Sequence, residues 1–250
     1  MSKLLVCIPF HYSEGRVQYL MQVLENFNHY EMEVDVIVDT NTGDLFQLDH
    51  EIGISEMVNK LSIIQHKELT HPFHLTWVGR KHIRENIDNY DYVMYTEDDM
   101  MLPWENFKNY IQTFHQLWPR YIPGLVRVEK AHDKLYITDS PLHQKFNTSL
   151  WYNQIDIRGL LTNINYPYHA QWIMPHEALK SSMRDNFVRM EDNRELAASY
   201  PMWELNKTAL VKLTSENQID PLCYTYHLPN NYSMSPDSSF GKIEVDKLFI

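Results

Sequence analysis

The sequence is poor in residue types that mark several classes of protein. Its only two cysteines, Cys7 and Cys223, lie far apart, so they form neither a disulfide framework nor a zinc site of the usual spacing, and we expect reduced thiols. Its 22 Lys and Arg residues are outnumbered by 33 Asp and Glu residues, which gives a formal net charge of −11. Because general binding to nucleic acid requires a basic surface, this composition argues against it.

Linkers and long apolar runs are also missing. With 7 glycines in 250 residues and no internal repeat, the chain offers no segment that would divide it into two domains. No apolar run approaches the length of a membrane span, and the run near residue 1 passes into polar residues without a cleavage site of small residues. We therefore expect no membrane span and a soluble protein, either natively cytoplasmic or a trimmed catalytic domain, with peripheral membrane association left open.

The apolar residues that are present follow the periods of an α/β fold. Segments 3–10, 33–40 and 90–98 are runs typical of buried parallel strands, and apolar residues between the first two recur along one face of a helix capped by Ser13. This order predicts a mostly parallel central sheet flanked by helices, with ligands bound where the strands end. The other expected elements are a helix after Pro103, a strand pair at 124–130 and 134–140, an irregular segment at 147–167, short helices at 174–183 and 192–199, and a loop or loose tail at 221–250.

Three consecutive carboxylates, Glu97, Asp98 and Asp99, follow the apolar part of the third strand. Like charges side by side repel each other and are costly to desolvate, so a fold tolerates them only in water or beside a cation. If the strand stays extended, Glu97 and Asp99 lie on one side and Asp98 on the other. Such a group suits a hard metal ion and a ribose hydroxyl, whereas a solvated acidic turn before a helix is the alternative.

This acidic triplet, downstream of a strand, helix and strand whose last strand ends in Asp39, resembles the nucleotide-sugar-dependent glycosyltransferases of GT-A fold. The segment YTEDDMMLPWENF is similar to the E-D-D version of their D-x-D metal motif. The resemblance covers about the first 200 residues as an order of motifs. It implies a single Rossmann-like glycosyltransferase domain at 1–250, with a nucleotide-binding half at about 1–100, an acceptor-binding half at about 101–230 and a tail at 231–250.

The resemblance also implies roles for individual residues. Asp99 would bind the divalent metal, Mn²⁺ or Mg²⁺, Asp98 would contact the donor ribose, and Glu97 would act through water or a neighbouring ligand. His227 would be an additional metal ligand from a late loop, although a packed histidine is the alternative. The other donor-binding residues would be Pro9, Phe10 and His11 around the base, Asp39 at the base edge unless it only forms a turn, and Arg80 at the diphosphate or sugar.

A second motif concerns the general base. The segment RMEDNREL resembles the E-D-x-x-L motif that supplies the base in a large family of inverting bacterial glycosyltransferases, although its apolar residue, Leu196, stands one position late. By this resemblance Asp192 would accept the proton of the acceptor hydroxyl. Asp192 and Glu195 also match a capping box at a helix start, and the two roles are compatible.

The resemblance predicts transfer of a hexose or pentose from a nucleoside-diphosphate sugar, with a UDP-sugar as the first candidate, to an oligosaccharide or glycan hydroxyl. A general base implies inversion at the anomeric carbon, which we expect, whereas a retaining enzyme would not need this base, so the stereochemistry stays open. Two alternatives remain. A sugar nucleotidyltransferase shares the sheet plan but begins with a Gly-rich phosphate loop, which IPFHYSEGR lacks, and a non-catalytic nucleotide- or sugar-binding module should have lost the acidic triplet, which is intact.

Overall fold

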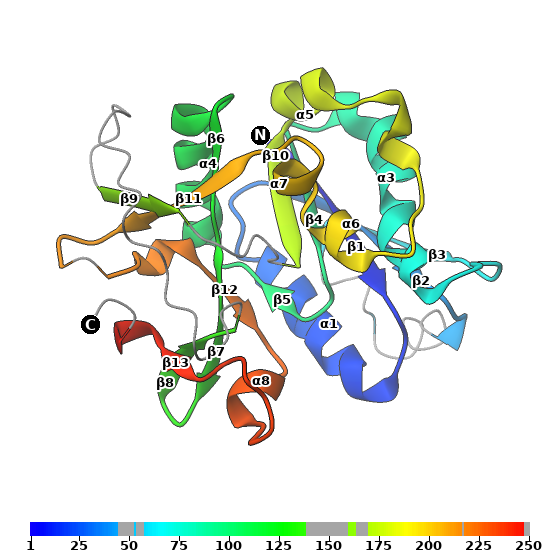
Figure 1. The fold of residues 1–250 in the computed structure, drawn as a ribbon. Coiled ribbons are helices and arrows are strands. Elements are labelled where there is room, and N and C mark those ends of the chain that lie inside the picture. The colour runs from blue at the N-terminus through cyan, green and yellow to red at the C-terminus, as the bar shows by residue number, and fades with distance from the viewer. Residues whose placement is uncertain (45–52, 54–57, 139–159, 164–169, 217, 248–250) are drawn as a thin grey trace. The chain divides into compact units, whose positions relative to one another are not determined.

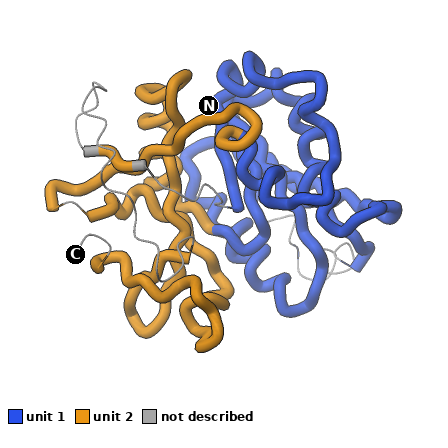
Figure 2. The backbone as a smooth tube through the Cα atoms, viewed as in Figure 1, with its two compact units in different colours: residues 1–100, 170–200 blue, residues 101–169, 201–250 orange. Residues whose placement is uncertain are grey.

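The computed structural model describes residues 1–44, 53, 58–138, 160–163, 170–216 and 218–247 (Figure 1). The chain forms two compact units, Met1–Met100 with Ala170–Tyr200 and Met101–His169 with Pro201–Ile250 (Figure 2). Cys7 and Cys223 are both buried free thiols, as expected. Among the described residues, no helix combines the length and the hydrophobicity that crossing a membrane requires.

The first unit is built on a five-stranded sheet in the order β10-β4-β1-β2-β3. Strands β1 to β4 are parallel, and β10 pairs antiparallel with β4 at one edge. Every residue of β1 after Lys3 is buried, as a central strand covered on both faces requires. The strands are β1 (Lys3–Phe10), β2 (Glu33–Thr40), β3 (Lys60–Gln65), β4 (Tyr92–Thr96) and β10 (Gln171–Pro175).

Helices α3 (Leu75–Asn86) and α5 (His176–Ser182) of the first unit pack against strands of this sheet. Helix α1 (Glu14–Phe27) buries Val17, Leu20 and Phe27, which confirms the predicted helix. Ser13 occupies the predicted cap position, but its side chain makes no capping hydrogen bond to a described residue. The other helices are η2 (Pro72–His74), η3 (Ile87–Asn89), η4 (Asp185–Val188), α6 (Arg194–Ala198) and, across the boundary of the unit, α7 (Tyr200–Trp203).

The predicted capping box at Asp192 is wrong by one position. The side chain of Asn193 accepts hydrogen bonds from the backbone N–H groups of Glu195 (3.0 Å) and Leu196 (3.3 Å). Helix α6 therefore begins at Arg194 with Asn193 as its cap. Asn satisfies these backbone donors as well as Asp does, so Asp192 has no capping role here and its side chain is left for other contacts.

The described residues of the second unit form two sheets and one long helix. One sheet has the order β6-β11-β9, and the other, which β5 joins at the unit boundary, has the order β13-β8-β7-β12-β5. The elements are β5 (Met100–Met101), α4 (Trp104–Leu117), β6 (Tyr121–Pro123), β7 (Val126–Ala131), β8 (Lys134–Ile137), β9 (Leu160–Asn163), β11 (Thr208–Leu213), η5 (Pro221–Cys223), β12 (Tyr224–His227), α8 (Asn231–Met234), β13 (Ile243–Glu244) and η6 (Val245–Lys247).

The expectations for this part of the chain are only partly confirmed. The predicted strand pair is the antiparallel hairpin of β7 and β8, whose turn residues His132 and Asp133 both have the positive φ that a tight two-residue turn uses. The loop or tail expected at 221–250 is wrong for β12 and β13, which pair with β7 and β8. Within the segment expected to be irregular, residues 160–163 form a strand paired with β11, and the remainder lies outside the described residues.

Two helical glycines provide a matched test of this packing. An added Cβ at Gly15 in α1 meets nothing within 4 Å, whereas at Gly79 in α3 it would lie 3.0 Å from the Cβ of Cys7 on β1. We predict that Gly15→Ala raises the free energy of unfolding by up to about 1 kcal/mol, since alanine is the better helix former. Gly79→Ala should instead lower it by up to about 2 kcal/mol, because overpacking outweighs that gain. Urea denaturation measures both, and an equal stabilisation by the two variants would contradict the close approach of α3 to β1.

Candidate functional site

A cavity of about 380 Å³ lies at the carboxyl edge of the parallel sheet in the first unit. The residues that line it lie at the end of β1 and just after it, after β4, in the first turn of α1, in η2, and at the starts of α3 and α6. Strand β1 lies between β2 and β4 in parallel register, so the three strands end at the same edge. The lining residues are Pro9, His11, Ser13, Arg16, Pro72, Phe73, Leu75, Thr76, Glu97, Asp98 and Arg194.

The acidic triplet meets a cation at this edge. Arg16, in the first turn of α1, donates to Asp98 through Nε (2.9 Å to Oδ2) and Nη2 (2.7 Å to Oδ1). The same Nη2 donates to Oδ2 of Asp99 at 2.9 Å. Asp98 and Asp99 are almost completely buried, at 3% and 4% exposure. One guanidinium therefore neutralises half of the charge of two buried carboxylates, and the three groups together retain a net charge of −1 when both carboxylates are ionised.

The backbone explains why both carboxylates reach the same arginine. Strand β4 ends at Thr96, and the N–H of Met100 donates to the carbonyl of Glu97 at 3.2 Å, which closes a tight turn. The expectation that an extended strand would place Asp98 opposite its neighbours is therefore wrong. Glu97 is half-buried and lines the cavity beside Asp98.

Burial and the neighbouring charges both shift the pKa values of this cluster. Burial raises the pKa of Asp98 to about 6, with the hydrogen bond from Arg16 opposing that effect and the charge of Asp99 adding to it. Burial also works against the charge of Arg16, but its hydrogen bonds and attraction to Asp98 and Asp99 raise its pKa above the ordinary value. The cluster is therefore short of positive charge, and additional positive charge would stabilise both carboxylates in their ionised form.

The residues expected to surround the nucleotide base differ in how deeply they are buried. Pro9 and His11 line the cavity, whereas the side chain of Phe10 is fully buried in the core, so only its backbone faces the sheet edge. Beyond them, the backbone N–H of Tyr12 donates to the side-chain oxygen of Asn41 at 2.9 Å, which fixes the start of this loop. Asp39 is buried at the end of β2, where its carboxylate contacts two histidines.

Arg80 occupies a place that sequence reasoning did not anticipate. It is 1% exposed, and its guanidinium carbon lies 4.2 Å from the ring centre of Trp77, within an aromatic cage completed by Phe187 and Tyr200. Arg80 also donates to the backbone carbonyls of Phe187 (3.4 Å) and Leu196 (3.3 Å). This residue fastens α3 to the segment 187–200, and it is not among the residues that line the cavity. Two other arginines, Arg16 and Arg194, line the cavity instead.

Asp192 is exposed and paired with histidine. Its side chain is 68% exposed, and its Oδ1 lies 2.8 Å from Nε2 of His74 and 3.8 Å from Nδ1 of His71. Nδ1 of His74 lies 3.1 Å from the hydroxyl of Thr70, which fixes the orientation of the ring. The residues between the two histidines, Pro72 and Phe73, line the cavity. Residues 70–74 therefore place the two histidines that contact Asp192 next to the residues that line the cavity.

His227 lies in the second unit, on β12. Its Nδ1 is 2.6 Å from the buried carboxylate of Glu129, which also accepts hydrogen bonds from the backbone N–H groups of Tyr232 (3.1 Å) and Ser233 (2.6 Å). Burial opposes ionisation of Glu129, but the hydrogen bonds from His227 and Ser233 lower its pKa overall. A carboxylate behind a histidine is the arrangement that orients metal-ligating imidazoles. Because Asp99 belongs to the first unit, a joint metal site of the two residues stays a prediction.

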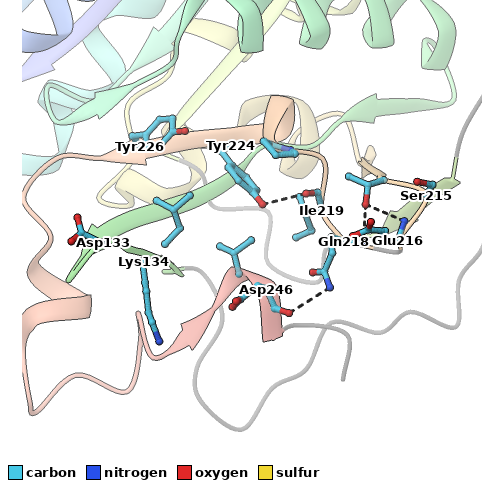
Figure 3. A pocket seen from close by; sticks show the side chains of 13 residues that line it. Asp133, Lys134, Ser215, Glu216, Gln218, Ile219, Tyr224, Tyr226 and Asp246 are labelled. Carbon is cyan, nitrogen blue, oxygen red and sulfur yellow. Dashed lines mark hydrogen bonds between the residues drawn. The ribbon is translucent and has the colours of Figure 1, made fainter.

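The second unit has a cavity of its own, with a volume of about 670 Å³ (Figure 3). Tyr224 and Tyr226 of β12 line it, together with Lys134 of β8 and Asp246 of η6. The hydroxyl of Tyr224 donates to the carbonyl of Ile219 at 3.2 Å. Aromatic side chains beside charged and polar groups form a lining that suits a ligand with both apolar and hydroxyl surfaces.

Comparison with known proteins identifies the fold. No protein-family model matches the chain, and no curated protein matches it. A solved structure of GalNAc-T7 with UDP, GalNAc and Mn²⁺ is similar over 91% of this chain and 44% of that one, with a TM-score of 0.53 and 11% identity. A structure of S. aureus TarS, residues 1–349, in complex with UDP-GlcNAc is similar over 93% of this chain and 62% of that one, with a TM-score of 0.44 and 14% identity.

The likeness to GalNAc-T7 shows a GT-A glycosyltransferase fold, which confirms the predicted fold class. The chain spans less than two thirds of the length of either structure. At these identities the likeness establishes the fold alone. Any reaction of this protein depends on the side chains of its own site.

Arg16 provides the test of the charge balance. Removing one partner of a fully buried ion pair costs about 3–5 kcal/mol, and because the side chain of Arg16 is 37% exposed we expect Arg16→Ala to lower the free energy of unfolding by only about 1–3 kcal/mol. Arg16→Lys should lower it less, since it keeps the charge but loses the two-pronged geometry. Lys180→Ala, which removes the exposed ion pair with Asp88, is the control and should have a much smaller effect. If Arg16→Ala is as stable as the parent protein, the two carboxylates do not depend on this cation.

Proposed function

We propose that this protein is a glycosyltransferase that moves a sugar from a nucleoside-diphosphate sugar to a hydroxyl group of a glycan acceptor. The observation that carries the proposal is the buried pair Asp98 and Asp99 beside a cavity at the carboxyl edge of a GT-A sheet. Open α/β sheets bind ligands at this edge, and the pair retains negative charge even beside Arg16. A sugar nucleotidyltransferase and a binding module of the same fold remain the alternatives, and their products distinguish them from a glycosyltransferase.

The donor is proposed to lie in the cavity of the first unit. The backbone of Pro9 and His11 would contact the base, and Asp98 would accept a hydrogen bond from a ribose hydroxyl. Arg194, which lines the same cavity, would attract the diphosphate. A UDP-sugar is the first candidate, because UDP is bound in the GalNAc-T7 structure that shares the fold.

The acidic pair fits a divalent metal of the hard class. Carboxylate oxygens are the ligands that Mg²⁺ and Mn²⁺ prefer, and two of these groups lie within reach of one guanidinium group. Asp99 is proposed as the metal ligand from this pair, with His227 as a further candidate. When bound, such a metal would supply positive charge next to a departing nucleoside diphosphate.

Asp192 is proposed as the general base. Its carboxylate would accept the proton of the acceptor hydroxyl as the hydroxyl oxygen bonds to the anomeric carbon and the bond from that carbon to the diphosphate breaks. Attack on the face opposite the leaving group gives inversion. His74, 2.8 Å from Asp192, would hold the carboxylate in position at the rim of the site.

The function is tested by the products. Incubated with UDP-sugars, oligosaccharide acceptors and Mn²⁺, the protein should release UDP and lengthen an acceptor by one sugar. Asp99→Asn should reduce the rate roughly 10²- to 10³-fold, since an amide is a weaker ligand than a carboxylate for the metal that would stabilise the leaving diphosphate. The matched control is Asp88→Asn, an exposed residue of the same unit paired with Lys180, which should keep the parent rate. Release of pyrophosphate from a nucleoside triphosphate and a sugar phosphate would contradict the proposal in favour of a nucleotidyltransferase, and donor binding without any product would favour a binding module.

The base is tested by separating proton transfer from helix capping. Asp192→Asn should reduce turnover roughly 10²- to 10⁴-fold, the usual contribution of a general base, while the melting temperature and the donor affinity stay at parent values. Asn193→Ala should do the reverse, lowering the free energy of unfolding by about 0.5–2 kcal/mol through loss of the cap. Should Asp192→Asn turn over at the parent rate, the base would have to be sought at Glu191, Asp185 or Glu204, or the reaction would be retaining.

A further inference from the structure

Three side chains from separate segments of the first unit converge at the end of β2. Asp39 is the penultimate residue of β2, His66 follows β3, and His82 lies in the middle of α3. Nε2 of His66 lies 2.7 Å from Oδ1 of Asp39, and Nε2 of His82 lies 3.2 Å from the same oxygen. One ligand atom from each residue lies within 4.8 Å of the other two. The two imidazoles thus aim the same ring nitrogen at one carboxylate oxygen.

The backbone holds this convergence in place from two sides. The N–H of His66 donates to the carbonyl of Thr40 at 2.8 Å, which continues the ladder between β2 and β3 and fixes His66 beside the end of β2. On the other side, Gly79 lies three residues before His82 on α3. A Cβ at Gly79 would lie 3.4 Å from Oδ2 of Asp39, so the absence of a side chain there lets α3 approach the strand closely. The cluster is therefore set by the fold.

The cluster has the composition of a transition-metal site. Two imidazole nitrogens and one carboxylate oxygen are common ligands of Zn²⁺, and a tetrahedral site with ligand bonds of about 2.0–2.1 Å separates its ligand atoms by about 3.4 Å. The separations of 2.7 Å and 3.2 Å from Asp39 to the two rings differ from that value by less than 1 Å. Small side-chain rotations would therefore place all three groups around one ion.

The site is also open to an ion on one side. The side chain of Asp39 is only 2% exposed, whereas those of His66 and His82 are 22% and 18% exposed. His66 also lines a cavity of about 170 Å³, shared with His11, Asn41 and Lys67, so one member of the cluster borders open space. A cation bound between the three groups would replace the contacts of both rings with the buried carboxylate and would neutralise its charge.

We propose that Asp39, His66 and His82 form a binding site for a divalent transition metal, with Zn²⁺ as the first candidate. This site differs from the acidic pair in its ligands, since imidazole favours Zn²⁺, Co²⁺ and Ni²⁺ over the hard ions that suit carboxylates alone. The ion would fasten β2, β3 and α3 together at the sheet edge. The inference does not rest on the glycosyltransferase proposal. It does give the carboxylate of Asp39 a metal ion to bind, whereas the sequence resemblance implies that this carboxylate contacts the edge of the nucleotide base.

The test is direct metal binding by the full chain without an affinity tag, after treatment with a chelator. Calorimetry with Zn²⁺ should show one equivalent bound at this site, and Co²⁺ should give the visible absorption bands of a four-coordinate ion. His66→Gln and His82→Gln place an amide nitrogen where Nε2 was, so they keep a hydrogen bond to Asp39 but lose the metal ligand. Each should weaken Zn²⁺ binding at least about 100-fold, beyond the 10- to 100-fold that loss of an outer partner costs.

Two controls make the result specific. Asp99→Asn should leave the Zn²⁺ affinity and the Co²⁺ spectrum unchanged, which separates this site from the acidic pair. His115→Gln, at an exposed histidine on α4, should also leave them unchanged. The proposal is overturned if the parent chain binds no equivalent of Zn²⁺ or Co²⁺, or if both His→Gln variants bind as tightly as the parent. In either case Asp39 and the two histidines form only a hydrogen-bonded cluster.

Discussion

The contact between Arg16 and the two buried aspartates is the interaction on which the site depends. Two carboxylates at 3% and 4% exposure would repel each other and lose their hydration, and the guanidinium offsets part of both penalties through hydrogen bonds of 2.7 to 2.9 Å. It also ties the start of α1 to the turn after β4. The contact joins these two elements at the sheet edge, and the two carboxylates, which it neutralises only by half, leave that edge negatively charged.

Two chemically different groups of possible metal ligands lie at this edge of the first unit. The turn after β4 offers carboxylates alone, whereas the ends of β2 and β3 with α3 offer one carboxylate and two imidazoles. Mg²⁺ and Mn²⁺ favour the first set and Zn²⁺ favours the second, so the two sets differ in the metal that they prefer. Arg80, the arginine expected at the donor, instead stabilises the helix that supplies His82 by packing among Trp77, Phe187 and Tyr200.

The local elements could be predicted from the sequence, and the long-range partners could not. Strands β1 and β2 have the bounds that segments 3–10 and 33–40 predict, because their apolar residues occupy the positions that these strands bury. The pairing of Arg16 with Asp98 joins residues 82 positions apart, and no local pattern distinguishes it from a solvated arginine at a helix start. The short strands β12 and β13 were missed because their partners, not their composition, make them strands.

The central claim is that the acidic pair is where metal and nucleotide meet, and anomalous diffraction tests it most directly. Crystals grown with UDP and MnCl₂ would be measured at the manganese absorption edge. We predict an anomalous peak bonded to the carboxylate of Asp99 and to the diphosphate of UDP, with Asp98 beside the ribose. Bound UDP with no manganese peak at Asp98 or Asp99, and Arg16 still joining the two carboxylates, would contradict the account.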